Sequence, residues 1–333
     1  MKVYGSRISY YTGKLEAYLR YKNIAYSALP MPYGDAKMLK EKVGAVQMPI
    51  VDDDGKWMSD TTPIIMHLET EHPVNSVLPQ DPAVGFISHL IEDYGDEWLT
   101  KAMFHYRWYF DADIKMAGTI LPRWSGIQNA EEKLVAMSDY IAKRQISRLY
   151  VVGSNDVTAN VIENSYKRFL SIMDDLIQKQ TSVLGQRPSS ADFGLYAQLT
   201  QLAKFDPTPA QICMEQAPRV HAWTDIVDDL SGNTAADSDW MDVADITANL
   251  GPLLNEIGRV YAPALLANAE ALQKGASEME TTIDGQRWVQ PTFAYQGKCL
   301  AAINQEYQNL DADSRAEIDD IFAGTGCETI LFR

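Results

Sequence analysis

The first 80 residues alternate short extended segments with helices, and the rest of the chain does not. This change limits the possible folds more than any other feature of the sequence. Apolar residues at helical spacing, such as Ile64, Ile65 and Leu68, give the helical segments a buried face. Asp54 and Gly55 lie between two apolar runs, which favours a hairpin turn. The expected order is strand, helix, strand, helix, strand, strand, helix, over residues 2–4, 11–22, 25–29, 37–42, 49–51, 56–58 and 61–71.

Strand patterns almost vanish after residue 83, and helical periodicity takes over. Leu90, Tyr94 and Trp98 recur every four residues, as an amphipathic helix requires. We therefore expect an α/β unit over residues 1–80 and an all-α unit over residues 83–232. A last region, residues 239–333, is also predicted to be helical. Its apolar faces need a partner surface, so we expect it to pack on the helical unit rather than to form a free module.

The charge of the chain disfavours two classes of partner. The sequence holds 29 basic and 45 acidic residues, a formal net charge of −16, which repels nucleic-acid phosphates and anionic membrane surfaces. No apolar run reaches the roughly 18 residues of a membrane span, and the first 21 residues lack the apolar core of a secretory signal. We expect a cytoplasmic protein with no nucleic-acid and no membrane partner.

Cysteine and histidine spacing argues against two further kinds of site. The three cysteines, Cys213, Cys299 and Cys327, lie far apart and do not form a disulfide framework. The five histidines show no metal-ligand spacing. A reduced compartment and a chain without a metal are therefore expected.

Several short motifs follow one another in a fixed order. They are Tyr4–Ser9, Val46–Val51, Asp54–Thr61, Ile64–Glu69, Ser189–Phe193 and Ala217–Trp223. Together they resemble the glutathione transferase superfamily over roughly residues 1–230. The resemblance implies an α/β plus all-α fold: a thioredoxin-like βαβαββα domain that binds glutathione, then the all-helical domain of that family. Members of the family end near residue 230, so residues 239–333 would be a helical extension.

The same resemblance implies where glutathione binds. A cis proline at Pro49 would present the Met48 backbone to the cysteinyl part of the tripeptide. Asp60 and Thr61 occupy the positions that hold the γ-glutamyl end, an acid for the amine and a hydroxyl for the carboxylate. Lys42 is the candidate for the glycyl carboxylate, with Lys40 as a second. The alternatives are a proline that starts an edge strand and an Asp60–Thr61 pair that only caps a helix.

Thiol activation is assigned by the resemblance to the turn before the first helix. Ser9 lies there, and its hydroxyl would donate to the glutathione thiolate and lower the pKa of that thiol. Tyr10 replaces the proline that often follows, and the phenols of Tyr10 and Tyr11 are rival catalytic donors, with Tyr4 and Thr12 behind them. The alternative for Ser9 is a serine that only forms the turn.

A cluster of aromatic and basic residues marks the first long helix of the second unit. In the resembling fold that helix lines the cleft, so His105, Tyr106 and Trp108 are assigned to the second-substrate cleft. An aromatic wall suits a hydrophobic second substrate. Packing in the core is the alternative for these side chains.

These features predict a glutathione transferase-like enzyme. Glutathione, as co-substrate, would attack an electrophilic, apolar small molecule in a detoxification reaction. The resemblance also implies a homodimer, and twofold dimers are the commonest soluble oligomers. The alternative is a non-catalytic protein of the same fold that binds glutathione or another ligand, or a partner protein, because a fold does not fix a function.

Overall fold

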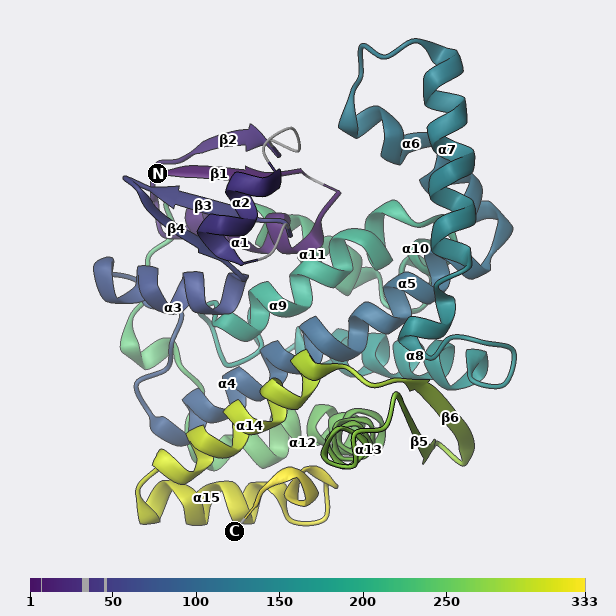
Figure 1. Cartoon of the computed structure of the whole chain (residues 1–333). Coiled ribbons are helices and arrows are strands. Elements are labelled where there is room, and N and C mark those ends of the chain that lie inside the picture. Colours follow the sequence, from purple (N-terminus) through teal and green to yellow (C-terminus); the bar gives the residue numbers. More distant parts are fainter. Residues whose placement is uncertain (7, 32–35, 45–46, 333) are drawn as a thin grey trace.

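The N-terminal unit is a thioredoxin-like sheet with helices on its faces, drawn in purple in Figure 1. The computed structural model describes residues 1–6, 8–31, 36–44 and 47–332. Four strands lie in the order β2-β1-β3-β4, with β1 parallel to β2 and antiparallel to β3. The strands are β1 (Lys2–Gly5), β2 (Ser27–Pro30), β3 (Ile50–Asp53) and β4 (Lys56–Ser59), and the helices are α1 (Tyr10–Tyr21), α2 (Ala36–Val43) and α3 (Thr61–Glu71). This confirms the predicted βαβαββα order.

Alternation in the strands and one apolar face per helix account for this unit. Val3 and Val51 are register partners on β1 and β3, and both are buried against Leu15 of α1 and Leu68 of α3 in one apolar cluster. Asp54 has a positive φ of 47° and so has Gly55, at 96°, as a tight hairpin between β3 and β4 requires. The sheet thus fixes the loops that precede β3 and α3.

A helical region follows, as predicted. Its helices are α4 (Pro82–Tyr94), α5 (Thr100–Tyr109), α6 (Asp111–Ser125), α7 (Glu131–Ile146), α8 (Ala159–Leu176), α9 (Ser190–Leu199), α10 (Pro207–Gln216) and α11 (Pro218–Asp228). A π-helical turn, Gly95–Leu99, joins α4 to α5, so that the two run on as one long rod (Figure 1). Ser189 and Asp192 form a capping box at the start of α9, which stabilises the first turn of that helix. No helix of the described residues is both long enough and apolar enough to span a membrane.

The extension contains a β-hairpin as well as helices. Its elements are α12 (Ile246–Glu256), α13 (Ala262–Gln273), β5 (Glu278–Ile283), β6 (Gln286–Pro291), α14 (Ala294–Asn309) and α15 (Ala312–Phe322). The hairpin was not predicted, although the sequence carries its signal. Asp284 and Gly285 form the turn with φ of 49° and 75°, and Met279, Ile283 and Trp288 supply buried positions on the two strands.

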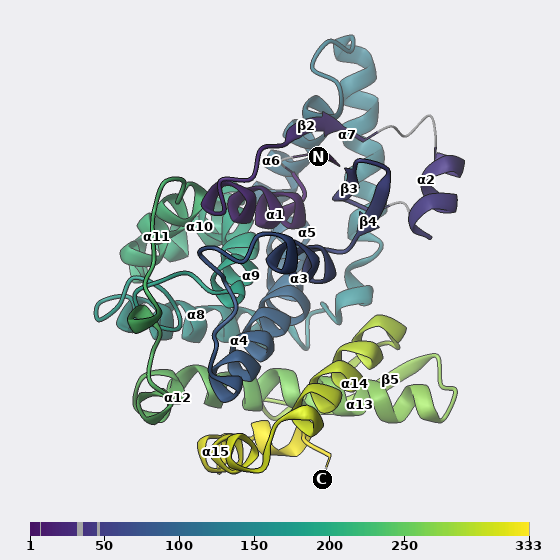
Figure 2. The same cartoon turned by 90° about the vertical axis from the view of Figure 1, so that its left-hand side faces the viewer.

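The extension lies along the helical region. Figures 1 and 2 show α14 and α15, in yellow, beside α4, and both helices contact α4. Helix α12 contacts α8 across the same face. The hairpin is anchored by Trp288, which is fully buried with its ring 5.4 Å from that of Trp98. This packing places the start of α14 beside the N-terminal unit.

Candidate functional site

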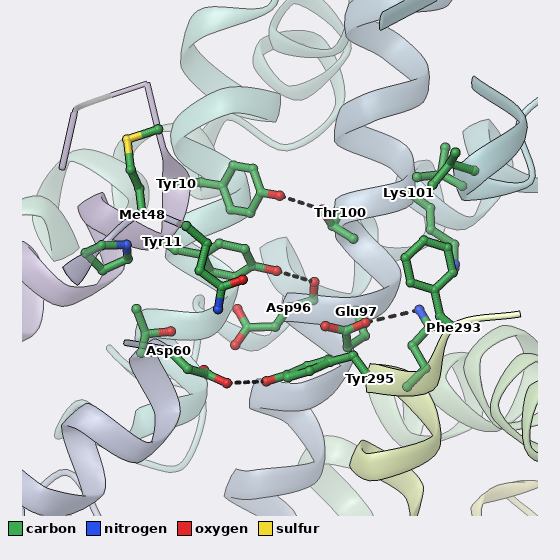
Figure 3. Close-up of a pocket in the computed structure, with 16 residues that line it drawn as sticks. Tyr10, Tyr11, Met48, Asp60, Asp96, Glu97, Thr100, Lys101, Phe293 and Tyr295 are labelled. Atoms are coloured by element: carbon green, nitrogen blue, oxygen red, sulfur yellow. Dashed lines mark hydrogen bonds between the residues drawn. The ribbon is translucent and has the colours of Figure 1, made fainter. Parts of the chain in front are cut away.

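A cavity of about 330 Å³ opens where the N-terminal unit, the α4–α5 rod and the extension meet (Figure 3). Three separate stretches of chain form its walls. The N-terminal unit contributes Tyr10, Tyr11, Gln47, Met48, Pro49, Asp60 and Thr61; the helical region contributes Asp96, Glu97, Thr100, Lys101, Val151 and Val152; the extension contributes Phe293, Tyr295 and Gln296. Four of the five expected glutathione-binding residues therefore share one wall.

The N-terminal wall is built by two loops that the sheet holds side by side. The Met48–Pro49 peptide bond is cis, as the resemblance implied, and Pro49 is buried directly before β3. Asp60 precedes α3 with a positive φ of 75°, and its side chain makes no capping hydrogen bond to that helix. The interpretation of Asp60 as only a helix cap is therefore wrong. Instead, Asp60 Oδ2 accepts a hydrogen bond from the Tyr295 hydroxyl at 2.6 Å.

The start of α1 places two phenols on the cavity, whereas Ser9 caps the helix. Ser9 is the N-cap of α1, and its Oγ accepts a hydrogen bond from the Thr12 amide at 3.3 Å. Ser9 is not among the residues that line the cavity, whereas Tyr10 and Tyr11 are. The hydroxyls of Tyr10 and Thr100 are hydrogen-bonded at 3.0 Å, and Tyr11 donates to the Asp96 carbonyl at 3.0 Å.

Burial keeps both phenols protonated. It raises the pKa of Tyr10, and it raises the pKa of Tyr11 well above the ordinary value. A phenol with a raised pKa acts as a hydrogen-bond donor rather than as a phenolate. Tyr10 and Tyr11 are therefore the donors that the cavity offers on this wall.

Several other expected residues lie away from the cavity. Lys42 and Lys40 are exposed on α2, and neither lines the cavity. Tyr4 stacks on Trp57, with 5.7 Å between the ring centres. Val46, which opens one of the motifs, lies outside the described residues.

The aromatic cluster of α5 belongs to the core and not to the cleft, which corrects the assignment of His105, Tyr106 and Trp108. Their exposed fractions are 0%, 0% and 2%. His105 Nδ1 is hydrogen-bonded to Ser154 Oγ at 2.8 Å, and its ring stacks on Tyr109. The physical reason is that α6, α8 and the short helical turn at 149–152 all contact α5 and cover its second half. Only the beginning of the helix reaches the cavity.

A buried ion cluster joins the N-terminal unit to the rod beside the cavity. Lys14 of α1 is fully buried, and its Nζ lies 2.6 Å from Glu92 Oε1 and 2.5 Å from Asp96 Oδ2. The ammonium thus satisfies two carboxylates that burial would otherwise destabilise. Removing Lys14 would leave two buried carboxylates without this partner, so the cluster holds α1 against the α4–α5 rod.

Three charged residues of the rod line the cavity and were missed by the sequence analysis, namely Asp96 of the ion cluster, Glu97 and Lys101. Lys101 is 3% exposed, and its Nζ donates to Gln290 Oε1 of β6 at 3.1 Å. Glu97 Oε2 accepts from Gln296 Nε2 of α14 at 3.1 Å. Burial lowers the pKa of Lys101 to about 8 and raises the pKa of Glu97 to about 7. Their spacing of four residues in an apolar helix was a usable signal, because charged residues on an apolar helix face seldom lie there without a partner or a task.

Metal binding finds no support among the residues that the structure describes. No group of three or more histidine, cysteine, aspartate or glutamate side chains there is placed to hold an ion. The polar side chains that line the cavity are phenols, carboxylates, hydroxyls, amides and one lysine.

Comparisons with known proteins bear on the N-terminal unit first. Residues 3–76 match the family model of the glutathione S-transferase N-terminal domain. No curated protein matches the chain. Similar solved structures include the beta-etherase LigF from Sphingobium sp. strain SYK-6, with 17% identity and a TM-score of 0.48 over 68% of this chain and 94% of that one.

Two further solved structures show a similar degree of likeness. A glutathione S-transferase from Rhodospirillum rubrum F11 has 19% identity and a TM-score of 0.44, over 71% of this chain and 93% of that one. The Tau class glutathione S-transferase from mango, Mangifera indica, has 15% identity and a TM-score of 0.43, over 76% and 97%. The overall likeness to these structures is low, and the family model matches residues 3–76 alone.

Proposed function

The N-terminal unit of this chain is a glutathione S-transferase N-terminal domain, and we propose that the cavity binds glutathione and activates its thiol for attack on an electrophilic, apolar small molecule. One observation carries the proposal. One cavity is lined by the Met48–Pro49 loop, the Asp60–Thr61 pair and the phenol of Tyr10, which all come from that domain (Figure 3). In the proposal the turn pairs with the peptide backbone, Asp60 accepts from the ammonium, Thr61 binds the carboxylate, and Tyr10 donates to the thiolate. A γ-glutamyl-cysteinyl ligand needs all of these contacts.

The tripeptide would lie along the N-terminal wall. Its γ-glutamyl ammonium faces the Asp60 carboxylate, which gives a charge-assisted hydrogen bond. Its α-carboxylate faces the Thr61 hydroxyl and the unpaired amides at the start of α3, where the helix dipole favours an anion. The extended cysteinyl backbone runs beside Met48. Tyr295 already donates to one oxygen of Asp60, so it orients the carboxylate toward the ligand.

Tyr10 is the proposed hydrogen-bond donor to the glutathione thiolate. Its hydroxyl lines the cavity and shares a hydrogen bond with Thr100. When Thr100 donates to the phenol oxygen, the Tyr10 proton is available to a thiolate, which stabilises the anion and lowers the pKa of the bound thiol. The Tyr11 hydroxyl already donates a hydrogen bond to the Asp96 carbonyl, and Ser9 caps α1. Both are therefore weaker candidates than Tyr10 for activating the thiol.

The apolar electrophile would occupy the part of the cavity beside Val151, Val152 and Phe293. A twofold homodimer and a detoxifying role in the cytoplasm belong to the same proposal, from the family resemblance alone. A non-catalytic glutathione-binding role is the second candidate. It is favoured by Ser9, the position to which the family resemblance assigns thiol activation, because Ser9 caps α1 and does not line the cavity.

Calorimetric titration with glutathione, followed by turnover of an activated aryl halide, tests the proposal. The transferase predicts saturable binding and thiol-dependent turnover, whereas the second candidate predicts binding without turnover. Asp60→Asn should weaken glutathione binding, and Asp54→Asn, in the exposed hairpin turn, is the matched control. A wild-type protein that binds no glutathione at millimolar concentration would contradict both candidates.

A further inference from the structure

Lys101 is a buried ammonium whose hydrogen-bonding capacity is only partly used. Lys101 is 3% exposed and lines the cavity. An ammonium has three donors, and buried polar groups are normally hydrogen-bonded. Among the described residues the one hydrogen-bond acceptor of Lys101 Nζ is Gln290 Oε1, at 3.1 Å. The face of Trp98 lies 6.0 Å away and adds a weak cation–π contact.

The other buried lysines near the N-terminal unit show what is missing. Lys14 meets two carboxylates at 2.6 and 2.5 Å, and Lys22, whose side chain is also fully buried, meets Glu69 at 2.9 Å. No described carboxylate forms an ion pair with Lys101, although Glu97 stands one helical turn before it. Glu97 is held instead by the amide of Gln296. Lys101 thus interacts electrostatically with Glu97 but has no carboxylate among the described residues within ion-pair distance.

The hairpin of the extension holds this ammonium in place without neutralising it. Gln290 on β6 is 1% exposed, and its Oε1 also accepts from Trp288 Nε1 at 3.0 Å. Two donors on one oxygen fix the orientation of that amide. A neutral amide positions the ammonium of Lys101 and brings no negative charge to it.

The surroundings of Lys101 indicate what kind of ligand its ammonium could bind. Figure 3 shows Lys101 and Phe293 at one end of the cavity and Met48 and Asp60 at the other. Val151 and Val152 line the same cavity. The end near Lys101 therefore combines a cation with apolar walls. Burial lowers the pKa of Lys101 to about 8, a value that still leaves it mostly charged at neutral pH.

We propose that Lys101 binds a carboxylate of the second substrate, so that the chain acts on an apolar electrophile that carries a carboxylate group. Gln290 is the positioning residue for this contact. The inference rests on the proposed function, because the glutathione end of the cavity supplies the thiol. It assigns the γ-glutamyl carboxylate of glutathione to the N-terminal wall, at Thr61 and the start of α3.

Equilibrium binding of a matched acid and ester tests the inference with the full chain. The probes are 4-chloro-3-nitrobenzoate and its methyl ester, titrated by calorimetry without glutathione. The wild-type protein should bind the acid at least about tenfold more tightly than the ester, because a buried charge-assisted hydrogen bond is made only to the acid. Lys101→Gln should abolish that preference, and Lys115→Gln, at an exposed site on α6, should keep it.

A second variant tests the charge while the lysine stays in place. Gln290→Glu puts a carboxylate against the ammonium, so the acid should bind about tenfold more weakly while the affinity for the ester changes little. A wild-type protein without preference for the acid would overturn the inference, whether or not the variants fold. A folded Lys101→Gln protein that keeps the preference would overturn it as well.

Glutathione titration in the same variants separates this inference from the proposed function. Unchanged glutathione affinity in Lys101→Gln is expected. A large loss of glutathione affinity there would show that Lys101 holds the tripeptide, which contradicts the inference. A wild-type protein that prefers the acid through Lys101 but binds no glutathione would support a carboxylate site at Lys101 and refute the proposed function, and with it the role of that carboxylate as part of a second substrate.

Discussion

The two walls of the cavity differ in how the chain supplies them. The N-terminal wall takes Met48, Pro49, Asp60 and Thr61 from two neighbouring loops of one small sheet domain. The opposite wall brings Lys101 of the rod together with side chains of the extension nearly 200 residues later in the sequence, such as Phe293. The first wall belongs to a domain that matches a family model, and the second lies outside the matched residues, 3–76.

The difference suggests a division of labour in the proposed reaction. A wall that comes with the family domain suits the constant co-substrate, and a wall assembled with the extension suits the variable one. Changes to the extension should then alter the second substrate and spare glutathione. Changes to the loops of the sheet domain should do the reverse. The following experiments can break or sharpen that contrast.

The largest effect is expected from Trp288→Ala. Trp288 is fully buried against Trp98, and its indole also donates to Gln290. Loss of such a ring costs about 3–5 kcal/mol of unfolding free energy. Chemical denaturation measures it, with Tyr140→Ala at a 67% exposed position as the control, expected within about 0.5 kcal/mol of wild type. A loss below about 1 kcal/mol would mean that the hairpin does not anchor this wall.

The next effect concerns the N-terminal wall. Asp60→Asn keeps the side-chain shape but removes the charge that faces the γ-glutamyl ammonium. Glutathione binding should weaken by about 1.5–3 kcal/mol, the range for hydrogen bonds to charged groups. The affinity for 4-chloro-3-nitrobenzoate should stay as in wild type. If calorimetry instead gave equal glutathione affinities for wild type and variant, the assignment of this wall would be wrong.

Thiol activation distinguishes Tyr10 from Ser9. Tyr10→Phe should lower turnover at least tenfold, about 1.4 kcal/mol of barrier, while glutathione still binds. Ser9→Ala should keep most of the turnover and lose about 1 kcal/mol of stability, because Ser9 caps α1. The pH dependence of thiolate absorbance with bound glutathione provides the readout. The opposite pattern, activity lost with Ser9 and kept without the phenol, would return the role to Ser9.

The smallest effect is a pH-dependent contact between α4 and the extension. Burial alone would lower the pKa of His89, but its hydrogen bond and ion pair with Glu306 of α14 outweigh burial and raise the pKa to about 9. The unfolded value is about 6.5, so the contact contributes fully below about pH 6.5 and is lost as pH rises through about 9.

Glu306→Gln should therefore lower the melting temperature at pH 6 and make little difference near pH 10. The pair is partly exposed, so the contribution is about 1 kcal/mol at most. Glu132→Gln, on the exposed face of α7, is the control. A deficit that is the same at both pH values would exclude titration of His89 as its cause.

The N-terminal wall was predictable because its signals are local. The Met48–Pro49 turn and the Asp60–Thr61 helix start are each read from adjacent residues, and their order fits one small domain. Thr61 to Glu71 was predicted as a helix with the bounds that α3 has. The thiol donor was predicted only as a set, because a single residue step on the first turn of α1 decides whether Ser9 or Tyr10 faces the cavity.

The opposite wall was not predictable because its residues are far apart in the sequence and no local signal links them. Lys101, Gln290 and Tyr295 meet only through tertiary packing of the extension. His105 and Trp108 were placed in the cleft because aromatic residues suit both a core and a binding wall, and only packing decides between them. The hairpin β5–β6 was missed, although the Asp284–Gly285 turn signals it.

One measurement tests both walls at once, namely calorimetric titration with S-(4-carboxybenzyl)glutathione, a conjugate that reaches from Asp60 toward Lys101. The two-wall account predicts that it binds the wild-type protein at least about tenfold more tightly than S-benzylglutathione, which lacks the carboxylate. It also predicts that Lys101→Gln removes this difference and that Asp60→Asn weakens both conjugates alike. Equal affinities of the two conjugates for the wild-type protein, or no binding of either, would contradict it.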